Sequence, residues 1–403
     1  MRKPGARRGA YPLPMPDADP ALLERARALL REHPLIDGHN DLPWAIRQDD
    51  RAAGDPDRYD LARPTPGHTD LARLRAGGVG GQFWSVYVPA EIGGGYARMQ
   101  LEQLDLARRM IARYPDDLAL CRTADEVEAA FASGRIGSLL GMEGGHVLEG
   151  SLGALRAYRE LGAAYLTLTH NLNTEWADSA TDEPAHGGLT DFGRYVVREM
   201  NRIGMLVDLS HVAPSTMADA LDVSEAPAIF SHSSARALCD VARNVPDEIL
   251  RRLPGNGGVC MVTFVAGFVS QAAADAIVPA HAEISRRSSG VTDVGELRAI
   301  RDSVLAGIEV PLPMVADVAD HVDHVARVAG FEHVGIGGDF DGSLIWPIGL
   351  EDVSGYPLLF AELLSRGWAD GDLARLAGGN ILRVMRAAER VAIQRPPMRV
   401  SPP

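Results

Sequence analysis

Short apolar or β-branched runs, bounded by glycine and followed by helical patterns, recur eight times along the chain. This alternation is typical of repeated βα units. Because eight parallel strands close a barrel, the pattern predicts an α/β fold of the (β/α)8 TIM-barrel type. The predicted strands cover residues 35–41, 79–88, 137–143, 165–170, 205–211, 228–232, 258–264 and 333–339.

The segments between these strands suit crossover helices. In residues 314–329 apolar side chains recur along one stripe, and residues 191–203 show the same pattern; each stretch ends at a glycine, which favours a helix stop there. Two connections, 42–78 and 266–310, are too long for simple turns. Long connections in a compact barrel are usually lids or substrate walls, and we expect that role here.

The 403 residues, 46% of them hydrophobic, suffice for one large barrel domain, which we assign to residues 21–394. Residues 1–20 are basic and then rich in proline, which predicts a disordered arm, and residues 395–403 predict a flexible tail. No apolar run is long enough for a signal peptide or for the ~20 residues of a membrane span. We therefore expect a cytoplasmic protein without a membrane partner.

The formal net charge of −14 argues against nucleic acid as a partner, because such binding needs clustered positive charge. It favours a small-molecule substrate. Lys3, in the predicted arm, is the one lysine of the sequence, which excludes mechanisms that need a core lysine, such as a Schiff base or a P-loop. Three widely separated cysteines, Cys121, Cys239 and Cys260, predict buried and reduced thiols.

Histidines and carboxylates stand repeatedly where the predicted strands end, and active sites of (β/α)8 enzymes assemble at those carboxyl ends. His39 and Asp41 are two residues apart on one strand, so their side chains point to the same face. The residues that end the predicted strands in this way are His39, Asp41, Glu143, His170, His211, His232 and Asp339.

Imidazole and carboxylate groups together bind zinc-like ions. Five such ligands, divided three and three through one shared group, suit two ions. Because no core lysine is available for carbamylation, Glu143 is the natural bridge. We expect His39, Asp41 and Glu143 to hold one ion and Glu143, His211 and His232 to hold the other.

Each of these residues, taken singly, is more often a hydrogen-bonded core or loop residue than a ligand; their joint placement at the strand ends favours the metal site. His321 and His324 are expected on the solvated face of a helix and are left out. His146 either supports a ligand or makes a structural hydrogen bond. The other histidines have no strand-end placement.

Several motifs, in order from about residue 35 to 390, resemble the renal (membrane) dipeptidase family of zinc peptidases. They include the motif His-Asn-Asp-Leu-Pro-Trp. The residues that carry the likeness are 39–44, 143–146, 168–171, 176–178, 230–234, 243–246 and 338–342.

The resemblance implies an amidohydrolase-type barrel with two zinc ions, held by the five ligands, and hydrolysis of dipeptides, including those with a D-residue at the C-terminal position. It also implies that His170 contacts the scissile carbonyl, that Arg243 holds the substrate carboxylate and that Asp339 handles protons and the substrate amino group. A homodimer is typical. Leu172 stands where the family has a cysteine, and this departure is characteristic of a bacterial-type intracellular relative.

The hypothesis is attack on the peptide bond by a hydroxide that, with Glu143, bridges the two zinc ions. One alternative keeps the metal chemistry but changes the substrate to a non-peptide amide, a lactone or a phosphoester. Another is a non-catalytic metal-binding protein, against which the complete set of ligands argues. For Arg243 the alternative is a surface salt bridge.

Overall fold

Eight parallel strands close into a barrel in this computed structural model, which describes residues 19–394 apart from the side chain of His281. The strands follow the order β2-β1-β9-β8-β7-β6-β5-β4, and the pairing of β2 with β4 closes the ring. The predicted TIM barrel is confirmed. The strands are β1 (Leu35–Asn40), β2 (Val79–Ser85), β4 (Ile136–Glu143), β5 (Ala163–Thr167), β6 (Leu206–Asp208), β7 (Ile229–Phe230), β8 (Val259–Val262) and β9 (Val334–Ile336).

A ninth strand, β3 (Leu118–Leu120), was not predicted. It pairs with the first residues of β4, from Ile136, while β5 pairs with the same strand only from Leu140 onward. The additional strand therefore lies at the amino-terminal rim of the barrel, outside the closed ring. Three residues are too few to show a periodic pattern in the sequence.

The barrel strands end earlier than the sequence pattern predicts. The ladder stops at Asp208 in β6 and at Ile336 in β9, three residues before His211 and Asp339, respectively. His211 and Asp339 have φ angles of 67° and 66°, in the left-handed region, which a strand cannot accommodate. The polar residues at the barrel mouth consequently lie mostly on turns that follow the strands.

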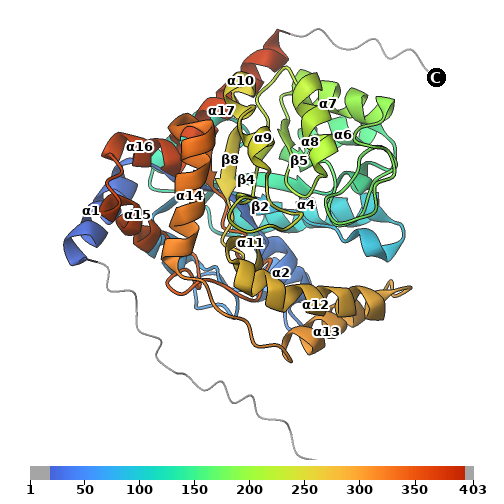
Figure 1. Cartoon of the computed structure of the whole chain (residues 1–403), viewed down its shortest axis with the longest axis horizontal. Coiled ribbons are helices and arrows are strands. Elements are labelled where there is room, and N and C mark those ends of the chain that lie inside the picture. The colour runs from blue at the N-terminus through green and yellow to red at the C-terminus, as the bar shows by residue number, and fades with distance from the viewer. Residues whose placement is uncertain (1–18, 395–403) are drawn as a thin grey trace, which may run out of the picture.

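Helices surround the strands (Figure 1). The predictions for 191–203 and 314–329 are confirmed by α7 and α14, which end at Gly204 and Gly330. The α-helices are α1 (Pro20–Glu32), α2 (Leu42–Gln48), α3 (Leu71–Ala76), α4 (Tyr96–Arg113), α5 (Ala124–Ala132), α6 (Leu152–Glu160), α7 (Asp191–Ile203), α8 (Pro214–Val223), α9 (Asp247–Leu250), α10 (Leu253–Asn256), α11 (Ala266–Val269), α12 (Gln271–Ser288), α13 (Val294–Leu305), α14 (Val315–Ala329), α15 (Tyr356–Ser365), α16 (Asp370–Ala374) and α17 (Asn380–Ile393). Short 3-10 or π-helical turns are η1 (Pro56–Arg58), η2 (Ala90–Ile92), η3 (Gly145–Leu148), η4 (Phe331–His333) and η5 (Arg375–Gly379).

Most of the predicted arm and all of the predicted tail, residues 1–18 and 395–403, lie outside the described residues. The last two residues of the arm form the N-cap and the first residue of the first helix. Asp19 caps α1 by accepting a hydrogen bond from the amide of Ala21, and Pro20 begins the helix, one residue before the predicted domain boundary. The assignment of 21–394 to one domain stays a prediction.

The expectation that His321 and His324 face solvent is wrong. They are 1% and 9% exposed, because α14 packs against α9, α11, α15 and β8 and so has little free surface. His321 bonds to backbone groups of Ala235 and Val269, and His324 lies 2.7 Å from a carboxylate oxygen of Asp247. Both are structural residues of the helix layer.

The two long connections are largely helical. Residues 42–78 contain α2, η1 and α3, and residues 266–310 contain α11, α12 and α13. The last two helices lie side by side at one end of the molecule (Figure 1). Arg298 of α13 donates to the carbonyl of Gln48, which ties this helical pair to the end of α2. The role of either connection as a lid stays a prediction.

Close approach of neighbouring strand ends fixes the geometry of the mouth. A Cβ atom on Gly337 would lie 1.9 Å from the carbonyl oxygen of Ser231, and one on Gly38 would lie 2.3 Å from the same atom. The amide of Ser231 is bonded to Asp208, so this backbone cannot shift freely. Glycine is therefore required at both positions.

Replacing Gly337 with alanine should lower the free energy of unfolding by roughly 1 to 3 kcal/mol, because the new methyl group meets backbone rather than a flexible side chain. Urea denaturation measures the change. Gly371→Ala is the matched control: nothing lies within 4 Å of its added Cβ, and alanine in a helix should raise stability by up to about 1 kcal/mol. Equal urea midpoints for the two variants would contradict the packing argument.

Candidate metal centre

Histidine nitrogens and carboxylate oxygens converge beyond the carboxyl ends of the barrel strands. Three overlapping groups have their donor atoms within 4.8 Å of one another. The seven predicted strand-end residues are thus brought together, although their roles stay predictions. The groups are His39, Glu143 and His232; Glu143, His170 and His211; and His39, Asp41 and Asp339.

Glu143, the last residue of β4, lies at the centre, and its two oxygens face different imidazoles. Oε1 is 3.0 Å from Nε2 of His211 and 3.4 Å from Nε2 of His232, whereas Oε2 is 3.4 Å from Nε2 of His39. Ser85 on β2 donates to Oε2 at 3.1 Å. A carboxylate that offers each oxygen to a separate set of donors has the arrangement of a bridging ligand.

The protonation states fit a cation site. Burial opposes ionisation of Glu143, but the charge of His39 and hydrogen bonds from His211 and His232 hold its pKa well below the usual range. Burial lowers the pKa of His211 and His232 well below the usual value, which leaves these rings neutral and able to offer lone pairs. Nε2 of His39 is fully buried and has no hydrogen-bond partner among the described residues. Burial opposes protonation of His39, but Tyr165, Glu143 and Asp41 raise its pKa well above the usual value, so a metal ion bound here would replace the proton of this ring. Two neutral imidazoles, a third that exchanges its proton for metal, and the carboxylates together fit a divalent metal ion.

Hydrogen bonds behind the imidazoles point their Nε2 atoms inward. The hydroxyl of Tyr165 lies 2.8 Å from Nδ1 of His39. The hydroxyl of Ser231 lies 2.8 Å from Nδ1 of His232 and donates at 2.6 Å to Asp208, which is fully buried. With Nδ1 occupied in this way, Nε2 is the free donor atom in each ring.

Asp339 lies on a tightly constrained turn after β9. Its amide donates to the carbonyl of His39 at 3.0 Å, and its Oδ1 is 4.0 Å from Nε2 of His39. A Cβ on Gly342 would come within 2.4 Å of carboxylate oxygens of both Asp41 and Asp339. Burial, together with the charges of Asp41 and Glu143, raises the pKa of Asp339 well above its usual range. This carboxyl group is therefore suited to hold a proton.

Arg243 is buried at 4% exposure, which rules out the alternative of a surface salt bridge. Its Nη1 donates to the hydroxyl of Ser233 and its Nη2 to the carbonyl of His232, both at 3.1 Å. Nε has no partner, and Arg243 forms no ion pair with a carboxylate within the described part of the chain. Burial lowers its pKa to about 10, so the group stays charged at neutral pH and can accept an anion.

His170 stands at the edge of the cluster, with its Nε2 3.9 Å from Oε1 of Glu143. Tyr87 packs against its ring, at 4.8 Å between centroids, and meets Trp44 edge-on at 5.0 Å. Sequence reasoning missed Tyr87 as part of the site, because an aromatic residue in a predicted strand is normally core. It also missed the supporting residue Tyr165 for the same reason.

Of the two roles considered for His146, the structure shows the structural hydrogen bond. Its Nε2 lies 3.0 Å from the carbonyl oxygen of Val88, and burial lowers its pKa to about 4. His186 and His333 also bond to backbone carbonyls, of Thr174 and Gly258. One ring nitrogen of each of these three histidines is bonded to a backbone carbonyl, and the three rings are not part of the cluster.

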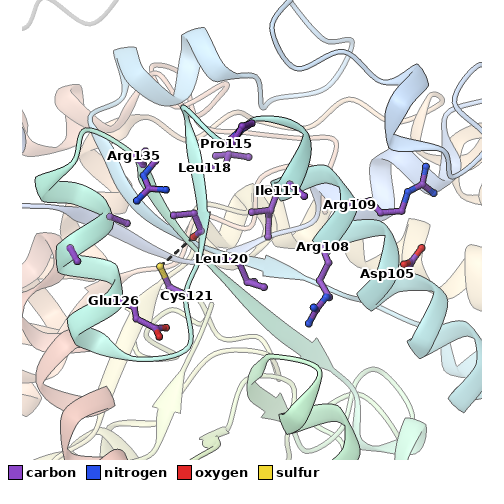
Figure 2. A pocket seen from close by; sticks show the side chains of 14 residues that line it. Asp105, Arg108, Arg109, Ile111, Pro115, Leu118, Leu120, Cys121, Glu126 and Arg135 are labelled. Atoms are coloured by element: carbon purple, nitrogen blue, oxygen red, sulfur yellow. Dashed lines mark hydrogen bonds between the residues drawn. The ribbon is translucent and has the colours of Figure 1, made fainter.

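A groove of about 720 Å³ lies away from the cluster, between α4, β3 and α5 (Figure 2). Arginine and apolar side chains line it, including Arg108, Leu120 and Arg135, and none of the predicted site residues does. The thiol of Cys121 donates to the carbonyl of Ala119 at its wall. Carboxylates of Asp105 and Glu126 also line the groove, but none of the three clusters found among the described residues includes a residue of this groove.

Comparison with known proteins agrees with this geometry. Residues 23–397 match the membrane dipeptidase family, peptidase family M19. Mouse Dipeptidase 3 is 44% identical over 380 residues, which cover 93% of this chain and 68% of the mouse protein. The chain belongs to the membrane dipeptidase family.

Solved structures support the assignment. The probable dipeptidase PvdM from Pseudomonas aeruginosa shares the fold with a TM-score of 0.79, at 23% identity, over 92% of this chain and 99% of that protein. A metallo peptidase from Rhodobacter sphaeroides, solved with a phosphinate mimic of the dipeptide L-Ala-D-Ala, superposes with a TM-score of 0.71 at 25% identity, over 88% and 99% of the two chains.

As a member of this family, the chain is a metal-dependent peptidase, which is a hydrolase. The resemblance to the membrane dipeptidase family, which the motifs indicated, is confirmed. Within residues 19–394, no helix has both the length and the apolar character needed to cross a bilayer.

Replacing Ser231 with alanine should weaken metal binding about 10- to 100-fold, because His232 then loses the group that fixes its ring. Competition with a chromophoric chelator measures the affinity directly. Ser210→Ala is the control, since the Ser210 hydroxyl accepts from the backbone amide of His232 and does not contact the ring. If both variants bind metal as the wild type does, the Ser231 hydroxyl does not orient the ligand.

Proposed function

We propose that this member of the membrane dipeptidase family binds two zinc ions and hydrolyses dipeptides, including those of the L-Xaa-D-Xaa type. The observation that carries the proposal is the position of Glu143, whose two oxygens face different imidazoles. The dipeptide mimic bound to the Rhodobacter sphaeroides relative supports the substrate class and the D-configuration at the second position.

The ligand assignment is the one made from the sequence. His39, Asp41 and Glu143 would hold one ion, and Glu143, His211 and His232 the other. Contacts of His39 with Asp41 and Glu143, and of Glu143 with His211 and His232, support this division. Bound divalent cations polarise a carbonyl group and lower the pKa of an attacking water towards neutrality. Zinc suits the mixture of imidazole nitrogen and carboxylate oxygen donors.

Three residues outside this ligand set would act on the substrate. Asp339 takes the proton of the attacking water and passes it to the leaving nitrogen as the carbon–nitrogen bond breaks. His170 donates a hydrogen bond to the carbonyl oxygen, where negative charge develops. Arg243 holds the terminal carboxylate of the substrate. Its guanidinium is buried and its Nε has no partner among the described residues, which supports this role.

The alternative substrate class, a non-peptide amide, lactone or phosphoester, uses the same metal chemistry. Arg243 favours the dipeptide, because a buried cation without a carboxylate partner fits a substrate that brings a carboxylate of its own. The homodimer and the cytoplasmic location stay predictions.

Hydrolysis of L-Ala-L-Ala, L-Ala-D-Ala and tri-alanine tests the proposal. Both dipeptides should be cleaved, the tripeptide should be a poor substrate, and a chelator should abolish cleavage until Zn²⁺ is restored. Titration of Zn²⁺ into the metal-free protein should saturate at two ions per chain. Inertness of the fully metallated protein towards both dipeptides, with activity on a lactone, would establish the alternative class instead.

Replacing Arg243 with lysine should raise KM for L-Ala-L-Ala about 10- to 100-fold, because lysine cannot form the two-pronged hydrogen bonds that a guanidinium gives a carboxylate. Hydrolysis of L-alanyl-alanine amide, which lacks the carboxylate, should change less than about twofold on the same reasoning. Initial rates over a range of concentrations give both values. An equal loss on the two substrates would show that Arg243 does not bind the carboxylate.

A further inference from the structure

His68 and Trp346 contact the turn that carries Asp339 from its outer side. The amide of His68 donates to Oδ1 of Asp341 at 2.7 Å, and the indole nitrogen of Trp346 donates to Nε2 of His68 at 3.0 Å. The Trp346 ring also packs on Phe340, with centroids 4.8 Å apart. His68 precedes the Asp339–Asp341 turn in the sequence and Trp346 follows it, and their contacts join both residues to the turn in one cluster.

His68 and Asp341 contact each other through backbone and side chain alike. The amide of His68 donates to Oδ1 of Asp341, and the backbone nitrogen of Asp341 lies 3.2 Å from Nδ1 of His68. Nδ1 of His68 also lies 3.3 Å from Oδ1 of Asp341, whereas Oδ2 of Asp341 has no partner within residues 19–394. Because Trp346 contacts the other ring nitrogen, Nε2, the imidazole is held against Asp341 from both ends.

The turn needs such support. Asp339 and Asp341 both have φ angles of 66°, a backbone conformation that residues other than glycine rarely adopt. On the inner side, the turn is held by the amide of Asp339 on the carbonyl of His39 and by the amide of Asp41 on the carbonyl of Phe340. His68 and Trp346 supply the support from the outer side, through Asp341.

We propose that His68 and Trp346 are positioning residues for Asp339: by clamping Asp341 they keep the turn in its left-handed form and aim the Asp339 carboxyl group at the cluster. The inference rests on the role proposed for Asp339. It gives the connection 42–78, which contains His68, a function in catalysis that does not depend on its closing over the substrate.

The test is to replace Trp346 with phenylalanine, which removes the indole N–H and keeps an aromatic ring on Phe340. The value of kcat should fall about 10- to 100-fold, since small displacements of a reacting group cost that much. The metal content per chain should not change, because no ligand is touched. The ratio of KM for L-Ala-L-Ala to KM for L-alanyl-alanine amide should also not change, because Arg243 is not touched. His68→Gln, which removes the imidazole, should show the same pattern.

Trp368→Phe is the matched control. Trp368 is also buried and also donates its indole N–H, to Asp323 at 2.7 Å, but it packs on Phe331 away from the turn. This variant should lose thermal stability comparably and keep the wild-type kcat. If both tryptophan variants lose kcat alike, the effect is general destabilisation and the proposal is wrong.

Asp339→Asn separates this inference from the function on which it rests. If Asp339→Asn keeps the wild-type kcat, the proposed proton role is wrong and so is the positioning of that group. If Asp339→Asn loses activity while Trp346→Phe and His68→Gln keep the wild-type kcat, the proposed function stands and the clamp is refuted. Loss of kcat in all three, with metal content unchanged, supports the clamp.

Discussion

Three carboxylates lie close together at the mouth of the barrel, and the rest of the site depends on how their charge is balanced. Asp41 and Glu143 are 5% and 4% exposed, and burial together with their charges raises the pKa of Asp339. At an effective dielectric constant of 20, two unit charges 4 Å apart repel by about 4 kcal/mol. His39 and Arg243 are the cations that face them. Divalent ions offset the remaining repulsion, so the cluster favours the metal-bound protein by its own electrostatics.

The same constraint explains why hydroxyl groups, rather than further carboxylates, stand directly behind the imidazoles. Tyr165 contacts His39, and Ser231 contacts His232. A carboxylate in either place would add another buried negative charge to the cluster. Asp208 lies one hydroxyl farther away, and its charge is met by donors from Thr167, Ser210 and Ser231. The fold thereby orients the rings without adding negative charge to the cluster.

Sequence reasoning could locate this cluster because two strong regularities coincide: eight βα units predict a closed barrel, and the carboxyl ends of parallel strands meet at one face. It could not give the turns beyond those ends, where the left-handed backbone of His211 and Asp339 is set by contacts between distant segments. It also misplaced His321, because amphipathic periodicity does not distinguish a face covered by other helices from one covered by water.

The turn that carries Asp339 shows where such prediction stops. This turn has the sequence Gly337-Gly338-Asp339-Phe340-Asp341-Gly342. The structure explains two of its glycines: a side chain at Gly337 would meet backbone, and one at Gly342 would meet two carboxylates. A left-handed backbone costs roughly 1 to 2 kcal/mol for residues with a Cβ, so glycine at position 339 would relieve this strain. Glycine would, however, remove the carboxyl group to which we assign the proton transfer. Two residues after Asp339, the carboxylate of Asp341 is bonded to His68, 273 residues earlier in the chain. A local sequence pattern cannot predict a contact between residues so far apart. The sequence therefore identifies Asp339 as a candidate but does not predict the direction of its side chain.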